Sequence, residues 1–278
     1  MSSSGRLRSV TVPEPLDSDR LRAALTGPYA QVDVVESTGS TNADLRRTAR
    51  AGAADRTVLF AEEQTAGQGR RARTWVSPPH TGLYVSVLLR PEVPPHRIPW
   101  ITLLAGVALA RTATGLGVDA ALKWPNDLLA GLDRAKCAGV LAEADDGVVL
   151  GMGLNVAALP GDVPPGAGGL PATSLEQQGA TTTDRTEIAI RLLGNLAELD
   201  DAWRQEHGDP IASGLHAEYR KHCSTLGLRV RIELPGDREL VGTAVEVDVD
   251  GQLVVRADDG ARRSVHAGDV VHLRSAAG

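Results

Sequence analysis

The sequence predicts an α+β protein in which a mixed β-sheet flanked by helices is followed by a small β-barrel. Strand-like and helix-like segments alternate up to about residue 225, and residues 98–115 have the length and apolar composition of a buried helix. From Gly227 onward, short strands are separated by Gly/Asp turns, which indicates a β-barrel of about fifty residues. We therefore expect a lead-in over residues 1–30, a large domain over 31–225 and a small domain over 226–278.

Hydrophobic patterning and turn residues predict the individual elements in chain order. In the large domain, strands are expected at residues 31–36, 57–62, 83–89, 120–123, 138–144 and 148–156. In the small domain, they are expected at 228–234, 238–249, 252–257, 262–266 and 270–273. Helices are expected at 18–25, 40–51, 98–115, 184–206 and 211–222. Thr41 with Asp44, and Asp184 with Glu187, fit capping boxes. Residues 159–172 hold four Pro and four Gly, so they predict a mobile surface loop.

Composition and charge exclude several classes of protein. The 278 residues are 42% hydrophobic and 23% charged, which is ordinary for a folded domain and excludes collagen-like or wholly disordered chains. The net charge of −6 disfavours a general nucleic-acid binder, whose affinity depends on many Lys/Arg–phosphate contacts. We therefore expect no DNA partner.

Cysteine, histidine and apolar patterns point to a cytoplasmic protein without a metal cluster. Two cysteines form no disulfide framework, which favours a reducing compartment. The seven histidines lack ligand-like spacing, so no zinc site is expected. Residues 1–9 are followed by no apolar signal-peptide region. The longest apolar stretch, residues 100–110, has about half of the roughly 20 residues that a membrane span needs, so no membrane partner is expected.

The segment Gly67–Arg73 is a candidate anion-binding loop. Its two glycines let backbone amides approach an anion. Each of its three arginines can bind two oxygens of a carboxylate or phosphate at once. The segment is neither a Walker A loop, which ends in Gly-Lys-Ser/Thr, nor a complete Rossmann fingerprint. The alternative is a basic turn exposed to solvent.

The segment Lys123–Asp127 is a second candidate, because it follows a strand and Pro125 keeps the preceding residue out of the helical region. Asn126 and Asp127 could bind a nucleotide or its Mg²⁺, which takes one or two carboxylates plus phosphate oxygens. The alternative is an Asn-Asp turn with Trp124 packed in the core.

Lys136 is a third candidate, since it precedes an apolar strand in which Gly139 permits close approach of a ligand. A lysine there can place a cation against a developing negative charge. The alternative is an ordinary exposed loop lysine. We expect the neighbouring Cys137 to be a small buried side chain and not a nucleophile.

Taken in order, these segments resemble the biotin–protein ligase family. The resemblance covers the chain from about Gln31 to the C-terminus, barrel included, and rests on these segments: Gly39–Asn42, Ala61–Trp75, Lys123–Asp127, Lys136–Glu143 and Gly151–Val156. It implies a class II synthetase-like, lipoyl ligase-like catalytic domain followed by an SH3-like barrel. It also implies formation of biotinyl-5′-AMP from biotin and ATP with Mg²⁺, and transfer of biotin to a lysine of a carboxylase carrier domain.

The resemblance assigns roles to matching positions of this sequence. It implies that the catalytic residues are Lys136, Asp127 and Arg70. The implied biotin-binding residues are Ser40, Thr41, Asn42, Gln64, Gly67, Gln68, Gly69, Arg70, Lys136 and Gly139. The implied ATP- or adenylate-binding residues are Arg70, Arg73, Trp75, Lys123, Asn126, Asp127 and Asn155. Mg²⁺ is expected to enter with ATP and not to bind a protein cluster.

Two positions depart from the family pattern. Gln68 stands where the family usually has Arg, and Ala72 stands where it usually has Gly. A Cβ at position 72 resists a positive φ. We interpret both changes as tuning the retention of the adenylate.

Other functions are considered beside the ligase. A lipoyl or octanoyl transferase shares the fold but lacks the Lys-Trp-Pro-Asn-Asp segment and the basic Gly loop. A non-catalytic biotin sensor, or an interaction module formed by the barrel, are further alternatives. Only thirty-one residues precede Val32, about half of what a winged helix-turn-helix needs. The expected partner is the biotin carboxyl carrier domain of an acetyl-CoA, acyl-CoA or pyruvate carboxylase, and the sequence leaves a homodimer open.

Overall fold

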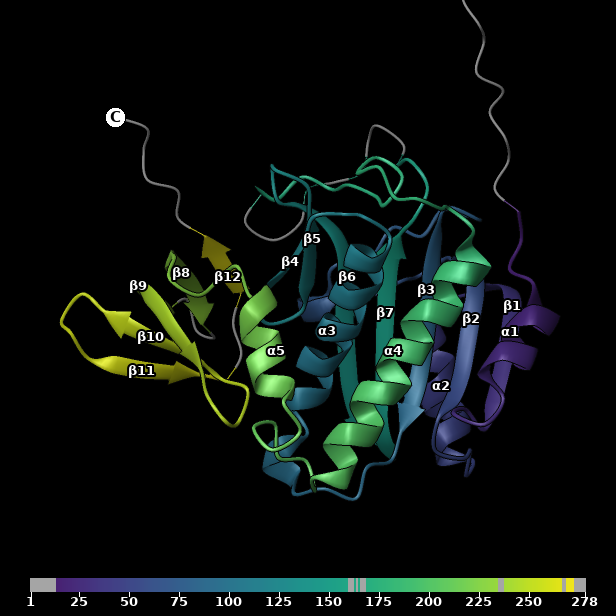
Figure 1. Cartoon of the computed structure of the whole chain (residues 1–278), viewed down its shortest axis with the longest axis horizontal. Coiled ribbons are helices and arrows are strands. Elements are labelled where there is room, and N and C mark those ends of the chain that lie inside the picture. Colours follow the sequence, from purple (N-terminus) through teal and green to yellow (C-terminus); the bar gives the residue numbers. More distant parts are fainter. Residues whose placement is uncertain are drawn as a thin grey trace, which may run out of the picture.

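The fold consists of a large mixed sheet covered by helices and a smaller sheet at its side (Figure 1). The computed structural model describes residues 14–159, 163, 165, 169–234, 238–266 and 269–272. The predicted α+β class, with a small all-β unit at the C-terminal end, is confirmed. The first thirteen residues of the predicted lead-in lie outside the described residues.

Seven strands form the large sheet in the order β1-β2-β3-β7-β6-β5-β4. Only β1 and β2 pair in parallel, and the other neighbours are antiparallel, so the sheet is mixed as expected. The strands are β1 (Gln31–Thr38), β2 (Thr57–Gln64), β3 (Gly82–Leu89), β4 (Ala120–Lys123), β5 (Asp127–Ala130), β6 (Ala135–Asp145) and β7 (Gly147–Asn155).

Helices cover both faces of this sheet. On one face, α3 (Trp100–Gly115) packs on β4 to β7 and against α4 (Arg185–Gln205), while α1 (Ser18–Leu25) and α5 (Leu215–His222) flank them. On the other face lies α2 (Thr41–Arg50), which packs on β2, β3 and β7. Residues 95–115 are long and apolar enough for a membrane span, but 67% of that apolar window is buried. The expected buried helix is therefore confirmed.

Several element boundaries differ from the sequence-based expectations. The cap of α2 is Ser40, whose hydroxyl accepts from the amide of Ala43, whereas the Asp44 carboxylate accepts from the Thr38 hydroxyl. The predicted capping box of Thr41 with Asp44 is therefore wrong, because the helix is capped one residue earlier. The strand β5 was missed because its four residues are all buried and show no alternation. The last helix begins at Leu215 and not at 211, because residues 210–213 form turns.

The small sheet contains the five strands that the sequence predicts. They are β8 (Arg229–Leu234), β9 (Arg238–Val247), β10 (Leu253–Ala257), β11 (Arg262–Val265) and β12 (Asp269–His272). All pairs are antiparallel, in the order β11-β10-β9-β8-β12.

Trp124 joins the two sheets. Its side chain is 1% exposed, and its indole Nε1 donates to the carbonyl of Gly251, 3.0 Å away. Its backbone amide donates to the hydroxyl of Thr225, which also contacts Nε2 of His272 in β12. The small sheet is thus fixed to the segment that leads from β4 into β5.

A buried ion pair between Glu62 and Arg185 anchors the opposite side of the large sheet. Both side chains are 3% exposed, and Nη1 of Arg185 lies 2.6 Å from Oε2 of Glu62. The Glu62 carboxylate also accepts from the backbone amide of Leu16 and contacts His80. Burial raises the pKa of Glu62, but the bonds from Arg185 and Leu16 outweigh it and hold the pKa below its usual range.

We predict that Arg185→Met lowers the free energy of unfolding by about 3 to 5 kcal/mol at pH 7, because it leaves a buried carboxylate without its cation. The loss is measured by urea unfolding. Since the folded-state pKa of Glu62 is depressed, the stabilisation is present above the unfolded-state value of about 4.3 and is lost as the pH falls through the folded-state value. The difference between the two proteins should therefore shrink in acid.

The matched control is Arg191→Met, which removes an arginine from the same helix. Arg191 is 49% exposed and pairs with Glu187, so its loss should change stability by less than about 1 kcal/mol. Equal losses in both variants would contradict the role assigned to the buried pair.

Candidate active site

A cavity of about 630 Å³ lies on the face of the large sheet that carries α2. Its floor includes Gly139 of β6 and Gly151 and Gly153 of β7. Cross-strand pairing places Gly139 opposite Gly153, and successive same-face residues of β7 are about 7 Å apart. The absence of side chains at these positions leaves a trough that runs along the two strands.

Two side chains lie directly on this glycine floor. A Cβ at Gly153 would come within 2.5 Å of the Trp75 indole, and a Cβ at Gly151 would overlap the amide of Asn42. The Trp75 ring also lies 5.6 Å from Nζ of Lys136. Its Nε1 is buried and has no hydrogen-bond partner among the described residues. Glycine is therefore required by close approach at both positions.

Neutral polar side chains form one end of the cavity. Ser40, Thr41 and Asn42 come from the start of α2, and Gln64 comes from the end of β2. The Oε1 atom of Gln64 accepts from the amide of Thr41 at 2.9 Å, and its Nε2 donates to the hydroxyl of Ser77 at 3.2 Å. This end holds hydrogen-bonding groups without a net charge.

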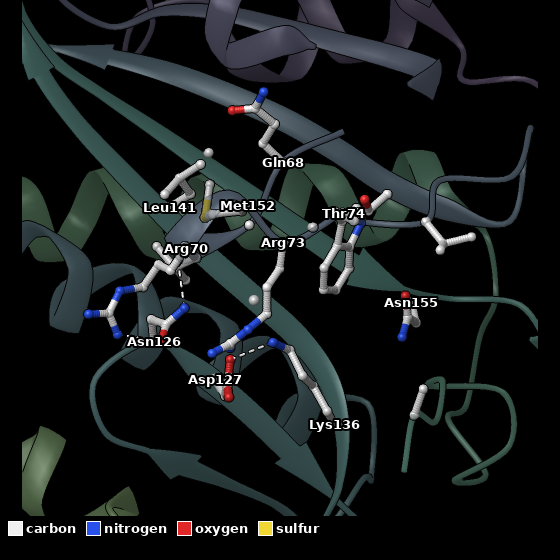
Figure 2. Close-up of a pocket in the computed structure, with 18 of the residues that line it drawn as sticks. Gln68, Arg70, Arg73, Thr74, Asn126, Asp127, Lys136, Leu141, Met152 and Asn155 are labelled. Carbon is white, nitrogen blue, oxygen red and sulfur yellow. Dashed lines mark hydrogen bonds and ion pairs between the residues drawn. The ribbon is translucent and has the colours of Figure 1, made fainter. Parts of the chain in front are cut away.

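Cations gather at the other end, around a single carboxylate (Figure 2). The Nζ atom of Lys136 lies 2.7 Å from Oδ1 of Asp127, and Nζ of Lys123 lies 3.6 Å from its Oδ2. Arg70 donates to Oδ1 of Asn126 at 3.3 Å, while Arg73 extends toward Asp127. With four cations and one carboxylate, the described lining has a surplus of three positive charges in an acidic protein.

Burial perturbs the groups at this cationic end. It lowers the pKa of Lys123, which is 3% exposed, and Lys136 lowers it further while Asp127 opposes both. Burial likewise lowers the pKa of Arg70, against the attraction of Asp127. An anionic ligand would relieve both effects, because it would return a negative charge to a partly dehydrated cluster.

The basic segment folds back as a short hairpin over the cavity. Gln68 bridges Thr74, and Arg71 and Ala72 at the tip have φ values of +55° and +56°. Ala72 therefore adopts the positive φ that its Cβ resists. Nη2 of Arg71 donates to the carbonyl of Glu233 in β8 at 2.8 Å, so the hairpin tip contacts the small sheet.

The structure brings the sequence-predicted residues together with one exception. The cavity is lined by Ser40, Thr41, Asn42, Gln64, Gln68, Gly69, Arg70, Arg73, Trp75, Lys123, Asn126, Asp127, Lys136, Gly139 and Asn155. Gly67 does not line it. A Cβ at this position would lie 2.6 Å from the carbonyl of Trp75, so Gly67 is needed for close packing within the hairpin.

Other lining residues were not singled out as site residues by the sequence. Val85 and Met152 belong to strands that were predicted, but nothing in their pattern distinguishes them from core residues. Val270 comes from β12 of the small sheet. Leu159, Val163, Pro165 and Ala172 show that the described part of the predicted 159–172 loop borders the cavity, and the expected mobility of that loop stays a prediction.

For Trp124 and Cys137, the structure supports a structural role in the core and not a role in chemistry. Trp124 is packed in the core, as the alternative for its segment required. Cys137 is fully buried, and burial raises the pKa of its thiol to about 12, which excludes an activated thiolate. Within the described ranges, no group of three or more His, Cys, Asp or Glu side chains is placed to hold a metal ion.

Known proteins resemble this chain in both of its parts. Residues 33–156 match the model of the biotin/lipoate A/B protein ligase family, and residues 225–273 match that of the biotin protein ligase C-terminal domain. The biotin--[acetyl-CoA-carboxylase] ligase of Mycobacterium tuberculosis is 44% identical over 271 residues, which cover 94% of this chain and 97% of that protein. The bifunctional ligase/repressor BirA of Salmonella typhimurium is 32% identical over 90% of this chain and 78% of its own length.

Solved structures with the same fold include two ligand complexes. Biotin protein ligase from Leishmania major with biotinyl-5-AMP has a TM-score of 0.59 and 28% identity. The match covers 86% of this chain and 99% of that one. The ligase from Aquifex aeolicus with biotin and ATP has a TM-score of 0.71, covering 89% of this chain and 100% of that one. At 24% identity, the latter similarity concerns the fold alone.

We predict that Ala72→Gly raises the free energy of unfolding by about 0.5 to 1 kcal/mol, because the left-handed conformation strains a residue with a Cβ. Urea unfolding measures the change. Ala66→Gly is the control, since Ala66 is exposed in the same segment but lies outside the positive-φ region. It should lower stability through the entropy of the unfolded chain. A loss of stability in both variants would refute the strain at position 72.

Proposed function

The chain belongs to the biotin/lipoate A/B protein ligase family, and we propose that it is an ATP-dependent biotin–protein ligase. The reaction makes biotinyl-5′-AMP and then transfers the biotinyl group to a lysine of a carboxylase carrier domain. The acceptor class follows from the name of the Mycobacterium tuberculosis relative, which acts on an acetyl-CoA carboxylase. The cytoplasmic location expected from the sequence belongs to this proposal.

The observation that carries the proposal is the order of surfaces within one cavity. A neutral polar end, a glycine floor and a cationic end follow one another along β6 and β7. Biotin has the same order of chemistry: a cyclic urea, an apolar thioether ring with its chain, and a carboxylate. Each part of the ligand therefore meets a surface of matching character.

Adenylation requires two anions to approach one another. A carboxylate oxygen of biotin attacks the α-phosphorus of ATP, and the bond from phosphorus to pyrophosphate breaks. Lys136 and Arg70, at the cationic end, are placed to offset the charge of both anions and to hold them in line. We assign Arg73, Lys123 and Asn126 to the phosphate and nucleotide side of the same end.

Transfer uses the same cations. The neutral amine of the carrier lysine attacks the acyl carbon of the adenylate, the bond from that carbon to the AMP oxygen breaks, and the amine loses a proton. Negative charge develops first on the carbonyl oxygen and then on AMP. A lysine fixed beside this position stabilises both, because its charge needs no reorganisation during the step.

Mg²⁺ fits this site as a companion of ATP. Asp127 and Asn126 are the side chains at the cationic end whose oxygens would hold it, and Asp127 is already paired with two lysines. The ion would draw most of its ligands from phosphate oxygens and neutralise their charge. The four cations of this end, Arg70, Arg73, Lys123 and Lys136, would orient the phosphates in any case.

The proposal predicts that Lys136→Ala lowers the rate of biotin-dependent pyrophosphate release by about 10²- to 10³-fold, the usual cost of removing one preorganised charge donor. The assay contains ATP, Mg²⁺ and biotin, and it follows pyrophosphate. Lys221→Ala is the matched control, because Lys221 is the third lysine of the chain and is exposed on α5. Its activity should equal that of the unmodified protein.

A parallel reaction with lipoate separates the two activities of the family. Release with biotin alone supports the biotin ligase. Release with lipoate alone would move the chain to the lipoyl ligases, and tight biotin binding without release from either acid would favour a sensor. A Lys136→Ala variant as active as the control would contradict the role given to this lysine.

A further inference from the structure

The turn between β4 and β5 is held from two sides. It consists of Trp124, Pro125 and Asn126, since the residues on either side of these three already pair in register. The large sheet holds the end of the turn: the carbonyl of Asn126 accepts from the amide of Val140, and Nδ2 of Asn126 donates to the carbonyl of Val140, each at 2.9 Å. The start of the turn is held from the small sheet.

The backbone amide of Trp124 depends on a side chain that the small sheet supports. This amide donates to Oγ1 of Thr225 at 3.0 Å, and Thr225 is completely buried. The same Oγ1 lies 3.0 Å from Nε2 of His272 in β12. Because one oxygen serves both contacts, loss of the ring would leave the acceptor of the Trp124 amide with one anchor fewer.

The ring of His272 is neutral, although charged residues act on it. Burial, helped by the positive charge of Lys123 and opposed by Asp127, lowers the pKa of His272 to about 4. At neutral pH the ring therefore holds a single proton. Whichever nitrogen carries it, Nε2 can form a hydrogen bond with the hydroxyl of Thr225, since a hydroxyl can both donate and accept.

The place of Trp124 bears on the charged residues at both ends of the turn. Lys123 directly precedes Trp124, and Asp127 begins β5, with Nζ of Lys123 3.6 Å from Oδ2 of Asp127. Both residues border the cationic end of the cavity. A misplacement of about 1 Å in groups that orient a reacting ligand can lower activity strongly. The support of the Trp124 amide therefore affects whatever anion this end binds.

We propose that His272 is a positioning residue that, through Thr225 and the backbone amide of Trp124, holds the turn after β4 in the arrangement that binds the phosphates of ATP. The inference rests on the proposed function, in which Lys123 and Asn126 lie on the phosphate and nucleotide side of the cavity.

The test replaces His272 by Ala, Gln and Asn. A glutamine amide reaches the place of Nε2, and it can present its oxygen or its NH₂ group to Thr225, so it serves both tautomers of the ring. An asparagine amide reaches only the place of Nδ1. We expect the KM for ATP to rise roughly fivefold in His272→Ala and His272→Asn, the cost of one lost hydrogen bond, and to be restored in His272→Gln. The kcat at saturating ATP and the Kd for biotin should be unchanged.

Hydrogen exchange of the Trp124 amide reports on the support itself and needs no activity. It is measured at a temperature at which the variants are folded. Protection of this amide should fall in His272→Ala and His272→Asn and return in His272→Gln. Pro125 has no amide proton, which simplifies the signal from a short peptide of this turn. If His272→Ala does not fold, the comparison of Gln with Asn decides.

The matched control is His216→Ala, which removes a histidine from the same joint between the sheets. Nε2 of His216 lies 2.7 Å from the carbonyl of Val247 in β9, and its ring packs edge-on against Trp100. This variant loosens the joint but leaves the hydrogen bond of the Trp124 amide in place. Its KM for ATP should equal that of the unmodified protein.

The outcomes separate this inference from the proposed function. An equal rise of the KM for ATP in His216→Ala, or no recovery in His272→Gln, would overturn the positioning role. A fall in kcat with the KM for ATP unchanged would also overturn it. Failure of the unmodified protein to bind biotin would contradict the proposed function. In that case the exchange of the Trp124 amide, together with ATP binding by calorimetry, still tests the role of His272.

Discussion

The cavity depends on the single carboxylate of Asp127. Lys123 and Asp127 face each other across β4 and β5, and both are nearly inaccessible to solvent. A buried ammonium without a partner costs several kcal/mol or loses its proton, so Lys123 can remain a cation only beside this group. The same carboxylate orients Lys136 from β6. Three strands thereby deliver their charges to one point at the cationic end of the cavity.

The cationic end of the cavity uses lysine, which is rare in this chain. The chain has three lysines against a total of 29 lysines and arginines, and two of the three line the cavity. Elsewhere in the part of the chain that the structure describes, arginine forms most of the ion pairs, as in the buried pair of Arg185 with Glu62. A lysine places a compact charge on a flexible stem, whereas a guanidinium is a planar fork that prefers two fixed oxygens. The compact charge suits an anion whose geometry changes during reaction.

Much of this site could be predicted from the sequence, because most of its residues lie in short continuous segments. The loop from Gly69 to Arg73 and the Lys123–Asp127 segment carry recognisable chemistry within a few residues. What could not be predicted depends on contacts between distant positions. Arg185 lies 123 residues from Glu62, and Val270 reaches the cavity from the other sheet. The strand β5 was missed because a short strand buried on both faces has no alternation of polar and apolar residues.

Local competition explains the error at the start of α2. Ser40, Thr41 and Asn42 could each cap a helix, and the sequence alone does not decide among them. In the structure, Ser40 takes the cap, which leaves the hydroxyl of Thr41 and the amide of Asn42 for the network on the sheet face. The shift by one position therefore gives the capping role to Ser40 and leaves the side chains of Thr41 and Asn42 to the network.

Because Trp124 joins the two sheets, their separation is linked to ligand binding in the cavity. Its indole and its backbone amide bind the small sheet, and the two residues that follow Pro125 face the cavity. Separation of the sheets would release this segment and dismantle one wall of the cavity. A molecule bound there must then oppose the separation by as much free energy as it gains from that wall. The two sheets should melt as one cooperative unit in the presence of ligand, since their buried apolar residues also belong to one continuous cluster.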